Sequence, residues 1–504
     1  MRPAALLIVA GCACGSSHPP PSAGIAGLVS VSKAAPWPAT CGEAPGRSTV
    51  TLNSEVEPSV AVDPLDGNHL IGAWQQDRWA NGGAKGVVSA TSFDGGHTWT
   101  TTVAAFSLCS GGPYQRATDP WVSIGPDGAA WQIAYSFDAN TADQAMLVSR
   151  SLDRGRSWEQ PRALIVDSDP DIVDDKETVT ADPHDARFVY AVWDRLTGTS
   201  IQNNPQGTGP TWFSRTTDRG ETWEPARTIY DPGADAQTIG NQIVVLPDGT
   251  LVNLMSVITQ NSTSNAIATL QIIRSGDRGA TWSQPVPIDT QDFVGAVDPK
   301  SGMAIRSGGI VPAIAVDAAS GALYVAWEDA RFSGLQRDGV FISKSIDGGL
   351  SWSARAQVNG APSTQAFTPA LSVAADGRVG VLYTDLREDN PNDKDHLMAT
   401  EWLAVSPGGT GPWTESRVGA PWNLRGAPVV GGPAYFLGDY QALGHAGNAF
   451  LPFFAAVGGT GSSDIFFRTA DAPASLAPLA AVAGSASPLP RGPRERWRLG
   501  RMFK

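Results

Sequence analysis

Acidic and basic side chains recur together at one place in a repeated strand pattern of this chain. Each pair follows an apolar run that is typical of a buried strand. Guanidinium groups bind carboxylates through two parallel hydrogen bonds, so these arginines could together hold an acidic substrate. The alternative is that each pair is a structural salt bridge copied with the repeat. The four pairs are Asp77 with Arg78, Asp194 with Arg195, Asp329 with Arg331, and Asp385 with Arg387.

A stricter repeat organises the elements that position these pairs. An octet of the form S/T-x-D-x-G-x-T/S-W recurs at intervals of roughly 60 residues, so one supersecondary unit is repeated. Aspartate and glycine two residues apart suit a tight turn, and the tryptophan would anchor a hairpin by its burial. The octets are 92–99, 151–158, 216–223, 275–282 and 345–352.

Two strand-like runs precede each octet, as at 58–64 and 70–74 in the first unit. Seven such pairs of runs can be followed along the chain, the last two without an octet. The pattern predicts an all-β protein built from four-stranded antiparallel sheets. The seventh unit lacks a fourth strand, and we expect residues 48–53 to supply it, because ring closure removes an exposed sheet edge.

The octet resembles the Asp box, or BNR repeat, of the sialidase superfamily of β-propellers. The resemblance implies a β-propeller over residues 45–472. Seven blades are favoured, and the six blades usual in the family are the alternative. In that family the Asp box is a folding element away from the catalytic centre, so we expect all five octets to be structural.

Strand pairing predicts where a functional site would lie. In an antiparallel pair, the start of the first strand and the end of the second strand meet at one rim. Each unit therefore delivers two loops to the same face, around the central channel. The polar residues at these positions are Glu57, Asp77, Arg78, Asp119, Asp138, Lys176, Glu177, Asp194, Arg195, Glu328, Asp329, Arg331, Asp385, Arg387, Asp439 and Tyr440.

The resemblance also implies roles for some of them. A sialidase-like site would need three arginines for the substrate carboxylate, an aspartate as acid/base, and a tyrosine nucleophile activated by a glutamate. The family's Arg-Ile-Pro motif is absent, and Glu57-Pro58 occupies that neighbourhood. The candidates are Asp77 as acid/base, Glu177 with Tyr440 as the nucleophile pair, Arg78, Arg331 and Arg387 for the carboxylate, and Arg195 as a further substrate-binding arginine.

The N-terminal sequence predicts export. An apolar run at 4–10, too short to span a bilayer, leads into Val9-Ala10-Gly11-Cys12, which resembles a bacterial lipobox. We therefore expect a signal peptide over 1–11, lipidation of Cys12 and a flexible tether over 12–44. The protein would be anchored to the bacterial cell membrane or secreted; an ordinary secretory signal is the alternative.

The remaining cysteines and the C-terminus add two expectations. Cys41 and Cys109 could pair in an oxidising compartment, which would tie the N-terminal arm to the first blade. Residues 473–504 are rich in alanine and proline and end in a basic run, so we expect a disordered tail.

Charge limits the partners and cofactors. A net charge of −13 argues against nucleic acid, whose phosphates need a basic face. We expect no cofactor: no spacing suggests zinc. The acidic run 167–175 offers oxygen ligands for calcium but lacks the full EF-hand pattern, and a solvated loop is the alternative.

Two functions remain open from the sequence. The first is an exported glycoside hydrolase acting on a carboxylated or sialylated glycan. The second is a non-catalytic surface lipoprotein that binds a glycan or another protein, because propellers host unrelated functions. In both cases we expect a monomer that touches the membrane only through its lipid anchor.

Overall fold

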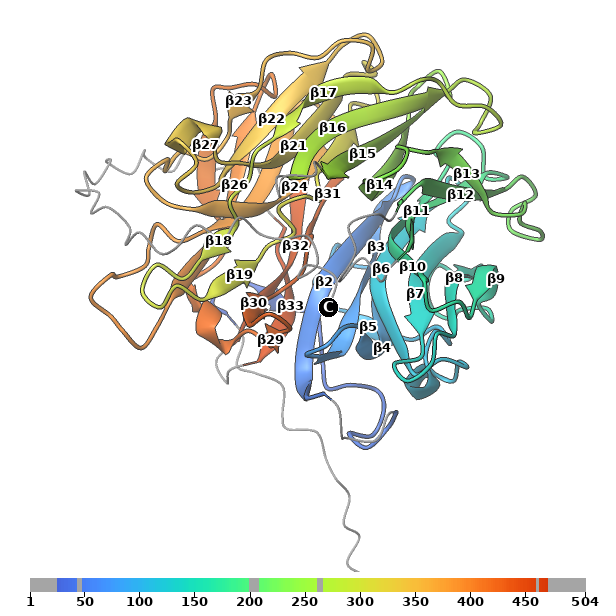
Figure 1. Ribbon diagram of the computed structural model, residues 1–504, viewed down its shortest axis with the longest axis horizontal. Coiled ribbons are helices and arrows are strands. Elements are labelled where there is room, and N and C mark those ends of the chain that lie inside the picture. The colour runs from blue at the N-terminus through green and yellow to red at the C-terminus, as the bar shows by residue number, and fades with distance from the viewer. Residues whose placement is uncertain (1–24, 43–47, 199–207, 261–265, 459–461, 470–504) are drawn as a thin grey trace, which may run out of the picture.

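The computed structural model describes residues 25–42, 48–198, 208–260, 266–458 and 462–469 (Figure 1). Regular structure in these ranges is β-strand, apart from three short 3-10 turns, so the predicted all-β class is confirmed. The turns are η1 (Leu108–Ser110), η3 (Arg331–Ser333) and η4 (Leu424–Gly426).

Most strands form antiparallel sheets of four, as predicted, paired in chain order. The first two sets join into one sheet through a single pair, Ala84 with Ala117. The sets are β2 (Val50–Asp63), β3 (Asp66–Trp79), β4 (Ala84–Ser92) and β5 (Thr100–Thr102); β6 (Arg116–Ile124), β7 (Ala130–Phe137), β8 (Gln144–Ser151) and β9 (Arg162–Asp167); β10 (Ile172–Ala181), β11 (Val189–Thr197), β12 (Thr211–Thr216) and β13 (Arg227–Tyr230); β14 (Ala236–Val245), β15 (Leu251–Gln260), β16 (Ala266–Ser275) and β17 (Val286–Gln291); β20 (Ala313–Val316), β21 (Leu323–Asp329), β22 (Gly339–Ser345) and β23 (Ala356–Gln357); β24 (Ala366–Val373), β25 (Val379–Asp385), β26 (Met398–Ser406) and β27 (Thr414–Arg417), with β28 (Trp422–Asn423) also on β26.

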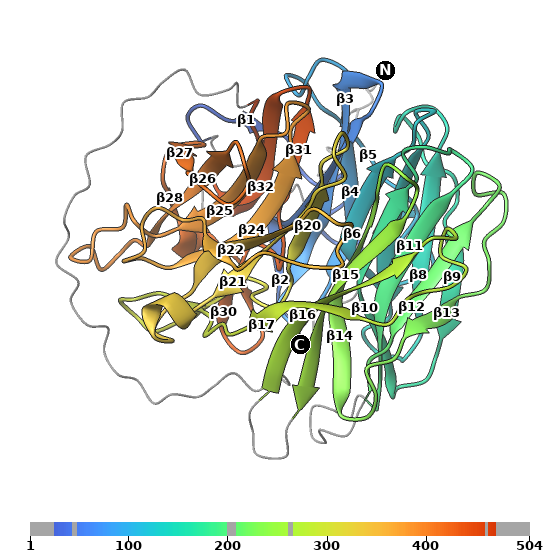
Figure 2. The same ribbon diagram turned by 90° about the horizontal axis from the view of Figure 1, so that it is seen from above.

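The first strand of each set lies toward the middle of the molecule. In Figures 1 and 2, β2 and β24 lie near the centre, while the last strands β9, β13 and β27 lie at the periphery. Apolar cores fill the spaces between neighbouring sheets. Trp74, Trp193 and Trp327, each on a second strand, are fully buried there.

The final sheet combines both ends of the described chain. It contains β31 (Ala442–Ala446), β32 (Ala449–Val457), β33 (Ser463–Phe467) and β1 (Val29–Ser30), which pairs with β33. The expectation that residues 48–53 supply this fourth strand is wrong. Val50 and Thr51 instead extend β2 and pair with Trp79 and Arg78 of β3.

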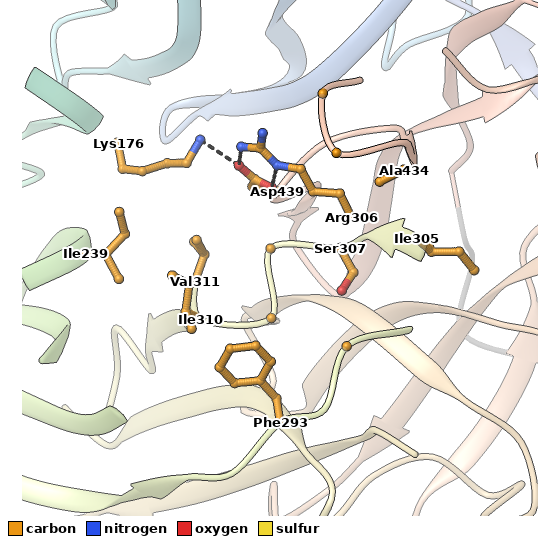
Figure 3. A pocket seen from close by; sticks show the side chains of 15 residues that line it. Lys176, Ile239, Phe293, Ile305, Arg306, Ser307, Ile310, Val311, Ala434 and Asp439 are labelled. Atoms are coloured by element: carbon orange, nitrogen blue, oxygen red, sulfur yellow. Dashed lines mark hydrogen bonds and ion pairs between the residues drawn. The ribbon is translucent and has the colours of Figure 1, made fainter. Parts of the chain in front are cut away.

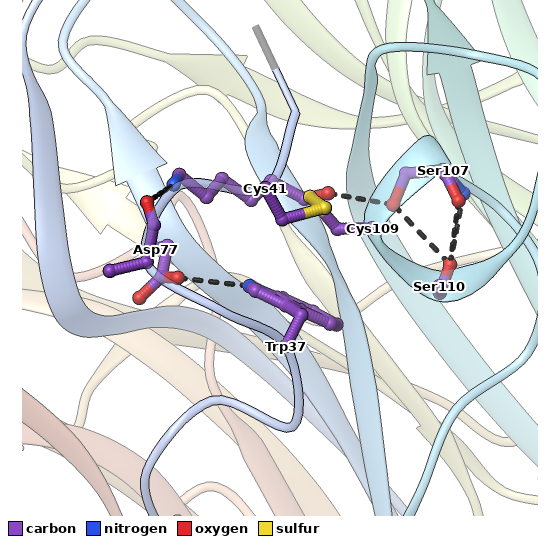
Figure 4. Close-up of a disulfide and its surroundings, with 8 residues drawn as sticks. Trp37, Cys41, Asp77, Ser107, Cys109 and Ser110 are labelled. Atoms are coloured by element: carbon purple, nitrogen blue, oxygen red, sulfur yellow. Dashed lines mark hydrogen bonds between the residues drawn. A yellow bond between two sulfur atoms is a disulfide. The ribbon is translucent and has the colours of Figure 1, made fainter. Parts of the chain in front are cut away.

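Residues 25–42 form a strap across the sheets, although they fall within the expected flexible tether. Val31 and Trp37 are buried in the core beneath the strap. A disulfide joins Cys41 to Cys109, as one reading of the sequence proposed (Figure 4). The predicted signal peptide, Cys12 and the tail over 473–504 lie outside the described residues.

A small bridging sheet joins two connections between the larger sheets. It is formed by β18 (Ala296–Val297), β19 (Ala304–Arg306), β30 (Ala434–Phe436) and β29 (Val429–Val430), and β19 runs parallel to β30. Gly431 N donates a hydrogen bond to Ala80 O, 2.7 Å away, which ties the bridging sheet to the first set of strands. This sheet carries Arg306 to the functional site.

Each Asp box is a closed, hydrogen-bonded turn. In the first box, Asp94 Oδ1 accepts from Thr98 N at 2.9 Å, and Oδ2 accepts from Thr98 Oγ1 at 2.6 Å. Ser92 Oγ accepts from Gly96 N at 2.9 Å. The hydrogen bonds from the hydroxyl and amide of Thr98 lower the pKa of Asp94 to about 2. Equivalent bonds occur in the other four boxes.

The box glycine seats the turn against the preceding sheet. Gly220 has a φ of +82°, and a Cβ there would lie 2.1 Å from the Trp131 ring. The other box glycines make similar contacts with their neighbours: Gly96 with Phe467, Gly155 with Ile71, Gly279 with Phe213, and Gly349 with Ile272. The boxes are therefore fasteners between sheets, in agreement with the structural role expected for them.

Candidate functional site

Three first strands share a bulge that directs a charged side chain inward. The register shifts near the start of β2, β6 and β10. Glu57, Asp119 and Lys176 occupy these bulges with φ of 55°, 51° and 50°. A left-handed backbone costs a residue with a Cβ about 1–2 kcal/mol, and such strain is concentrated at functional sites. The bulges therefore mark a candidate site.

The three bulge side chains meet in a buried charged cluster. Lys176 Nζ lies 3.2 Å from Glu57 Oε1 and also contacts Asp119 Oδ1. It lies 2.9 Å from Asp439 Oδ2 and 3.9 Å from Asp175 Oδ1. The Lys176 side chain is only 6% exposed. We define the charged cluster as Glu57, Arg78, Asp119, Asp175, Lys176, Arg306 and Asp439.

Two arginines complete the cluster. Arg306 Nε donates to Asp439 Oδ1 at 2.8 Å, and its Nη2 donates to Oδ2 (Figure 3). The guanidinium carbons of Arg78 and Arg306 lie 5.0 and 4.7 Å from the centre of the Phe436 ring. Nε and Nη1 of Arg78 have no hydrogen-bond partner among the described residues. These two nitrogens of Arg78 are buried, whereas Arg306 is paired with Asp439.

Burial and neighbouring charges give the carboxyl groups of the cluster different pKa values. Burial and the nearby charge of Asp119 raise the pKa of Glu57 to about 7, although Lys176 opposes this rise. Burial raises the pKa of Asp175 to about 6, again against Lys176. Burial alone would also raise the pKa of Asp439, but Arg306 and Lys176 hold it well below its usual value.

Two cavities adjoin the cluster. A cleft of about 680 Å³ is lined by Glu57, Arg78, Asp119, Asp175, Lys176 and Arg306, together with residues 138–144, Pro170 and residues 172–174. A smaller pocket of about 60 Å³ shares Lys176 and Arg306, and its other walls are mainly apolar. Figure 3 shows Ile239, Phe293 and Val311 around this pocket, with the ion pairs of Asp439 at its edge. The cleft has the size of a small-molecule site.

Asp77, expected as the acid/base, has a structural role. It is fully buried, and its Oδ2 accepts a hydrogen bond from Trp37 Nε1 at 3.0 Å (Figure 4). Its Oδ1 accepts from Asn53 N at 2.8 Å. These bonds attach the strap to β2 and β3, and Asp77 does not line the cleft. The assignment of Asp77 as acid/base is therefore wrong.

Glu177 and Tyr440 do not form the expected nucleophile pair. The Tyr440 hydroxyl donates to Pro120 O at 3.2 Å, so its proton is not directed at a carboxylate. Glu177 Oε1 instead accepts from Tyr135 N. Burial and the carboxylates around it raise the pKa of Tyr440 well above its usual value, which makes a phenolate nucleophile unfavourable.

Three of the four expected substrate-binding arginines are committed to carboxylates of their own. Arg195 binds Asp174 and Asp167, and both its contacts are buried or nearly so. Arg331 and Arg387 also bind carboxylates of the protein. The expected carboxylate-binding triad of Arg78, Arg331 and Arg387 is therefore not assembled. The salt-bridge alternative is right for Arg331 and Arg387, which bind Asp329 and Asp385 of their own pairs together with Asp289 and Glu415. It is wrong for Asp194 with Arg195, because Asp194 accepts hydrogen bonds from Thr238, Gly240 and Asn241 instead.

The acidic run at 167–175 is also engaged by protein groups. Asp167 and Asp174 hold Arg195, and Asp169 Oδ1 accepts from Asp171 N at 2.9 Å. Within the described ranges, no three metal-ligating side chains are placed to hold an ion. Asp167, Asp169 and Asp174 of the run proposed for calcium are therefore used in contacts within the protein.

Glu57, Asp119, Lys176 and Asp439 lie on the rim that the strand pattern predicts. The catalytic roles, however, were expected for Asp77, Glu177 and Tyr440. Arg306 was missed because it follows a connection that is not repeated between units. A signal for the bulges was present: Glu57-Pro58 and Asp119-Pro120 open two first strands. A proline there cannot join the strand ladder, which is typical of a bulge.

Comparison with known proteins agrees with the repeat. Residues 211–388 match the family model for the BNR repeat-like domain. The predicted Asp-box, or BNR-repeat, protein is thus confirmed over this part of the chain. No curated protein matches the sequence.

Solved structures of similar fold share little sequence with this chain. A Hadza microbial sialidase is 16% identical, with a TM-score of 0.45, over 80% of this chain and 73% of its own. An α-L-arabinanase from Penicillium chrysogenum is 12% identical, with a TM-score of 0.45, over 84% and 99%. A leech intramolecular trans-sialidase is 14% identical, with a TM-score of 0.40, over 86% and 70%.

None of the helices in the described ranges has the length and apolar character needed to cross a membrane.

Proposed function

We propose that the chain is a seven-bladed β-propeller whose ring is closed by β1. The first strands β2, β6, β10, β14, β20, β24 and β31 contact one another in that order, and β31 contacts β2. Pairing of β1 with β33 supplies the last blade with its outer strand. Closure of this kind leaves no first strand at an open edge.

We further propose that this propeller is an exported glycoside hydrolase that acts at the charged cluster. The observation that carries the proposal is a pair of carboxyl groups, Glu57 and Asp175, in the wall of one cleft. Burial raises the pKa of each into the range useful for acid–base chemistry near neutral pH. Export and a lipid anchor at Cys12 remain part of the proposal on the strength of the N-terminal sequence.

The separation of these carboxyls suits glycoside hydrolysis. Glu57 Oε1 and Asp175 Oδ1 lie 3.2 and 3.9 Å from the same Lys176 Nζ, so they cannot be farther apart than the sum of these distances. Retaining enzymes need roughly 5–5.5 Å and inverting enzymes roughly 6.5–9.5 Å. A carboxyl separation below this limit is compatible with a retaining mechanism, in which Asp175 is the nucleophile, and with an inverting mechanism, in which Asp175 activates a water.

In the proposed mechanism Glu57 is the general acid, since its pKa is the higher of the two. Protonated Glu57 would give its proton to the leaving oxygen, while ionised Asp175 attacks the sugar or activates a water. Arg78, which lines the cleft, would bind a carboxylate of the glycan. No cofactor is needed for this chemistry.

The proposal predicts a bell-shaped pH dependence. Asp175 must be ionised, which requires a pH above its pKa of about 6. Glu57 must be protonated, which requires a pH below its pKa of about 7. We expect kcat/KM to be highest between these values and to fall on both sides.

The test is turnover by the full chain of fluorogenic glycosides bearing sialic acid, a uronic acid or a neutral sugar. We expect Glu57→Gln to lower kcat at least about 100-fold. Glu159→Gln, which removes a charge from a surface pair with Arg150, serves as the matched control. Full activity of Glu57→Gln combined with loss in Tyr440→Phe would transfer the chemistry to the tyrosine.

A non-catalytic glycan-binding module is the alternative function. The position of Arg78 in the cleft supports binding as well as it supports hydrolysis. Arg78 can hold a carboxylate whether or not a bond is then cleaved. Glycan-array binding that is lost in Arg78→Met, by a protein that turns over none of the three classes, would establish binding without catalysis.

A further inference from the structure

Four carboxylates converge on Lys176 from different parts of the chain. Glu57 comes from β2, Asp119 from β6 and Asp175 from β10, whereas Asp439 precedes β31. The lysine nitrogen is the point at which these elements meet. Asp439 is additionally neutralised by Arg306, which leaves Lys176 as the nearest cation to the other three.

This arrangement makes protonation of the cluster a collective property. At about 4 Å, two like charges repel by about 4 kcal/mol in an environment of intermediate dielectric constant. The carboxylates around Lys176 therefore cannot all be ionised at small cost. The ammonium stabilises some of the negative charges, and the remaining carboxyl groups must keep protons.

We propose that Lys176 is the positioning residue of the acid–base pair, whose buried ammonium allows both Glu57 and Asp175 to ionise near neutral pH. The inference rests on the hydrolase function proposed above. Lys176 touches no reacting bond in this scheme and acts through the carboxyl groups that it contacts.

Lys176 lies close to both carboxyls, 3.2 Å from Glu57 Oε1 and 3.9 Å from Asp175 Oδ1. Asp119 lies beside Lys176 and adds a negative charge near Glu57, which opposes ionisation of Glu57. For both Glu57 and Asp175, Lys176 is the largest influence that opposes burial. Other charged and titratable groups face the cluster: Arg78 beside Glu57, Arg306 beside Asp175, and Glu177 and the Tyr440 ring, the latter 5.8 Å from Lys176 Nζ.

The test compares pH profiles of wild type, Lys176→Met and Lys176→Arg. Loss of the ammonium should raise the pKa of both carboxyls, because an opposite charge within about 4–6 Å lowers a carboxyl pKa by about 1–3 units. We expect the acidic limb of kcat/KM in Lys176→Met to move up by about 1 pH unit or more. Lys176→Arg keeps the positive charge and should leave that limb close to the wild-type position.

Lys300→Met is the matched control for loss of a buried lysine. Lys300 is 4% exposed and binds Asp389 at 2.8 Å, outside the cluster. We expect it to lower stability without moving either limb. If Lys176→Met fails to fold, Asp119→Asn provides a test of opposite sign, because loss of that negative charge should lower the pKa of Glu57 and move the alkaline limb to lower pH.

An infrared titration separates this inference from the hydrolase proposal. The band of protonated buried carboxyl groups, assigned by its loss in Glu57→Gln, should persist to higher pH in Lys176→Met. Such a shift in a protein without turnover would support the role of Lys176 and overturn only hydrolysis. Unmoved limbs and an unmoved band in Lys176→Met would reduce Lys176 to a structural residue and overturn the inference.

Discussion

At the scale of single residues, the cost of an ion pair in this protein depends on where it lies. Asp439 is 5% exposed and compensates both Arg306 and Lys176. Asp376 pairs with Arg378 at 2.7 Å, but its side chain is 33% exposed. Water can replace the partner of an exposed charge, whereas a buried charge that loses its partner stays uncompensated.

Asp439→Asn should therefore destabilise the protein far more than Asp376→Asn. We expect a loss of about 3–5 kcal/mol for the buried position, against about 0–1 kcal/mol for the exposed one. Urea denaturation of both variants at pH 7 measures the two free energies of unfolding. Equal losses would show that the cluster is open to water, contrary to its burial in the structure.

Residue types on the rim could be predicted from the sequence, but their partners could not. The strand pattern located Glu57, Lys176 and Asp439 at one end of the first strands. Which side chain meets which depends on the bulges, where one or two residues alter the direction of every following side chain. Arg306 arrives through the bridging sheet, which has no counterpart in the other units.

At the scale of elements, the Asp box explains how separate sheets become one body. Its hydrogen bonds close the turn, and its glycine lets the turn approach the preceding sheet. Box arginines add a second attachment: Arg219 reaches Asp127 and Arg278 reaches Asp185, each in the turn of the preceding set of strands. A repeated local motif thus encodes a repeated contact between sheets.

Gly220→Ala should destabilise the protein for two reasons, the left-handed backbone at this position and the lack of space for a Cβ. The substitution would strain a φ of +82° and drive a methyl group into Trp131 at 2.1 Å. Gly249→Ala is the control, because Gly249 has a φ of +83° and no neighbour within 4 Å. We expect the control to lose about 1–2 kcal/mol and Gly220→Ala to lose about 1–3 kcal/mol more. Thermal unfolding of both, with no difference between them, would contradict the fastening role.

The order of strands and turns could be predicted from the sequence, because each octet has a fixed form and each strand pair shows a clear alternation. The outer strand of the last sheet was misassigned, since β1 is two residues long and leaves no period to detect. Residues 50–53 do lie in a strand, but that strand, β2, pairs with β3. Local pattern predicts strand formation better than it predicts the pairing of distant strands.

At the scale of the whole molecule, many carboxyl groups are buried without a cation beside them. Burial raises the pKa of Asp194 and Glu401 to about 8 and that of Asp338 to about 7. In the unfolded chain such groups titrate near about 4. The folded protein therefore binds more protons than the unfolded chain between about pH 4.5 and 8, so stability falls as pH rises through this window.

We expect the melting temperature to be higher at pH 5 than at pH 8, and Glu401→Gln to reduce this difference. Glu401 accepts hydrogen bonds from Thr384 Oγ1 and Gln441 Nε2, and an amide can satisfy both partners. Each such group contributes up to about 1.4 kcal/mol per pH unit in its window. Calorimetry across pH 5–8 measures the effect. Stability that rises with pH would contradict this account.

The disulfide should stabilise the molecule through its unfolded state. The bridge joins Cys41 to Cys109 across 68 residues. Replacement of both cysteines by serine should cost about 2–4 kcal/mol, because the unfolded chain regains loop freedom. Denaturation of the variant and of reduced wild type should coincide, and an unchanged midpoint in the variant would contradict the prediction.

Pairing of β1 with β33 also has a consequence for biosynthesis. Val29 pairs with Phe467, so β1 is synthesised long before its partner strand β33. Until then the nascent chain presents two uncovered sheet edges, which invite association with other chains. The last sheet therefore cannot be completed before β33 has been synthesised, and a chain that stops before β33 is prone to aggregate.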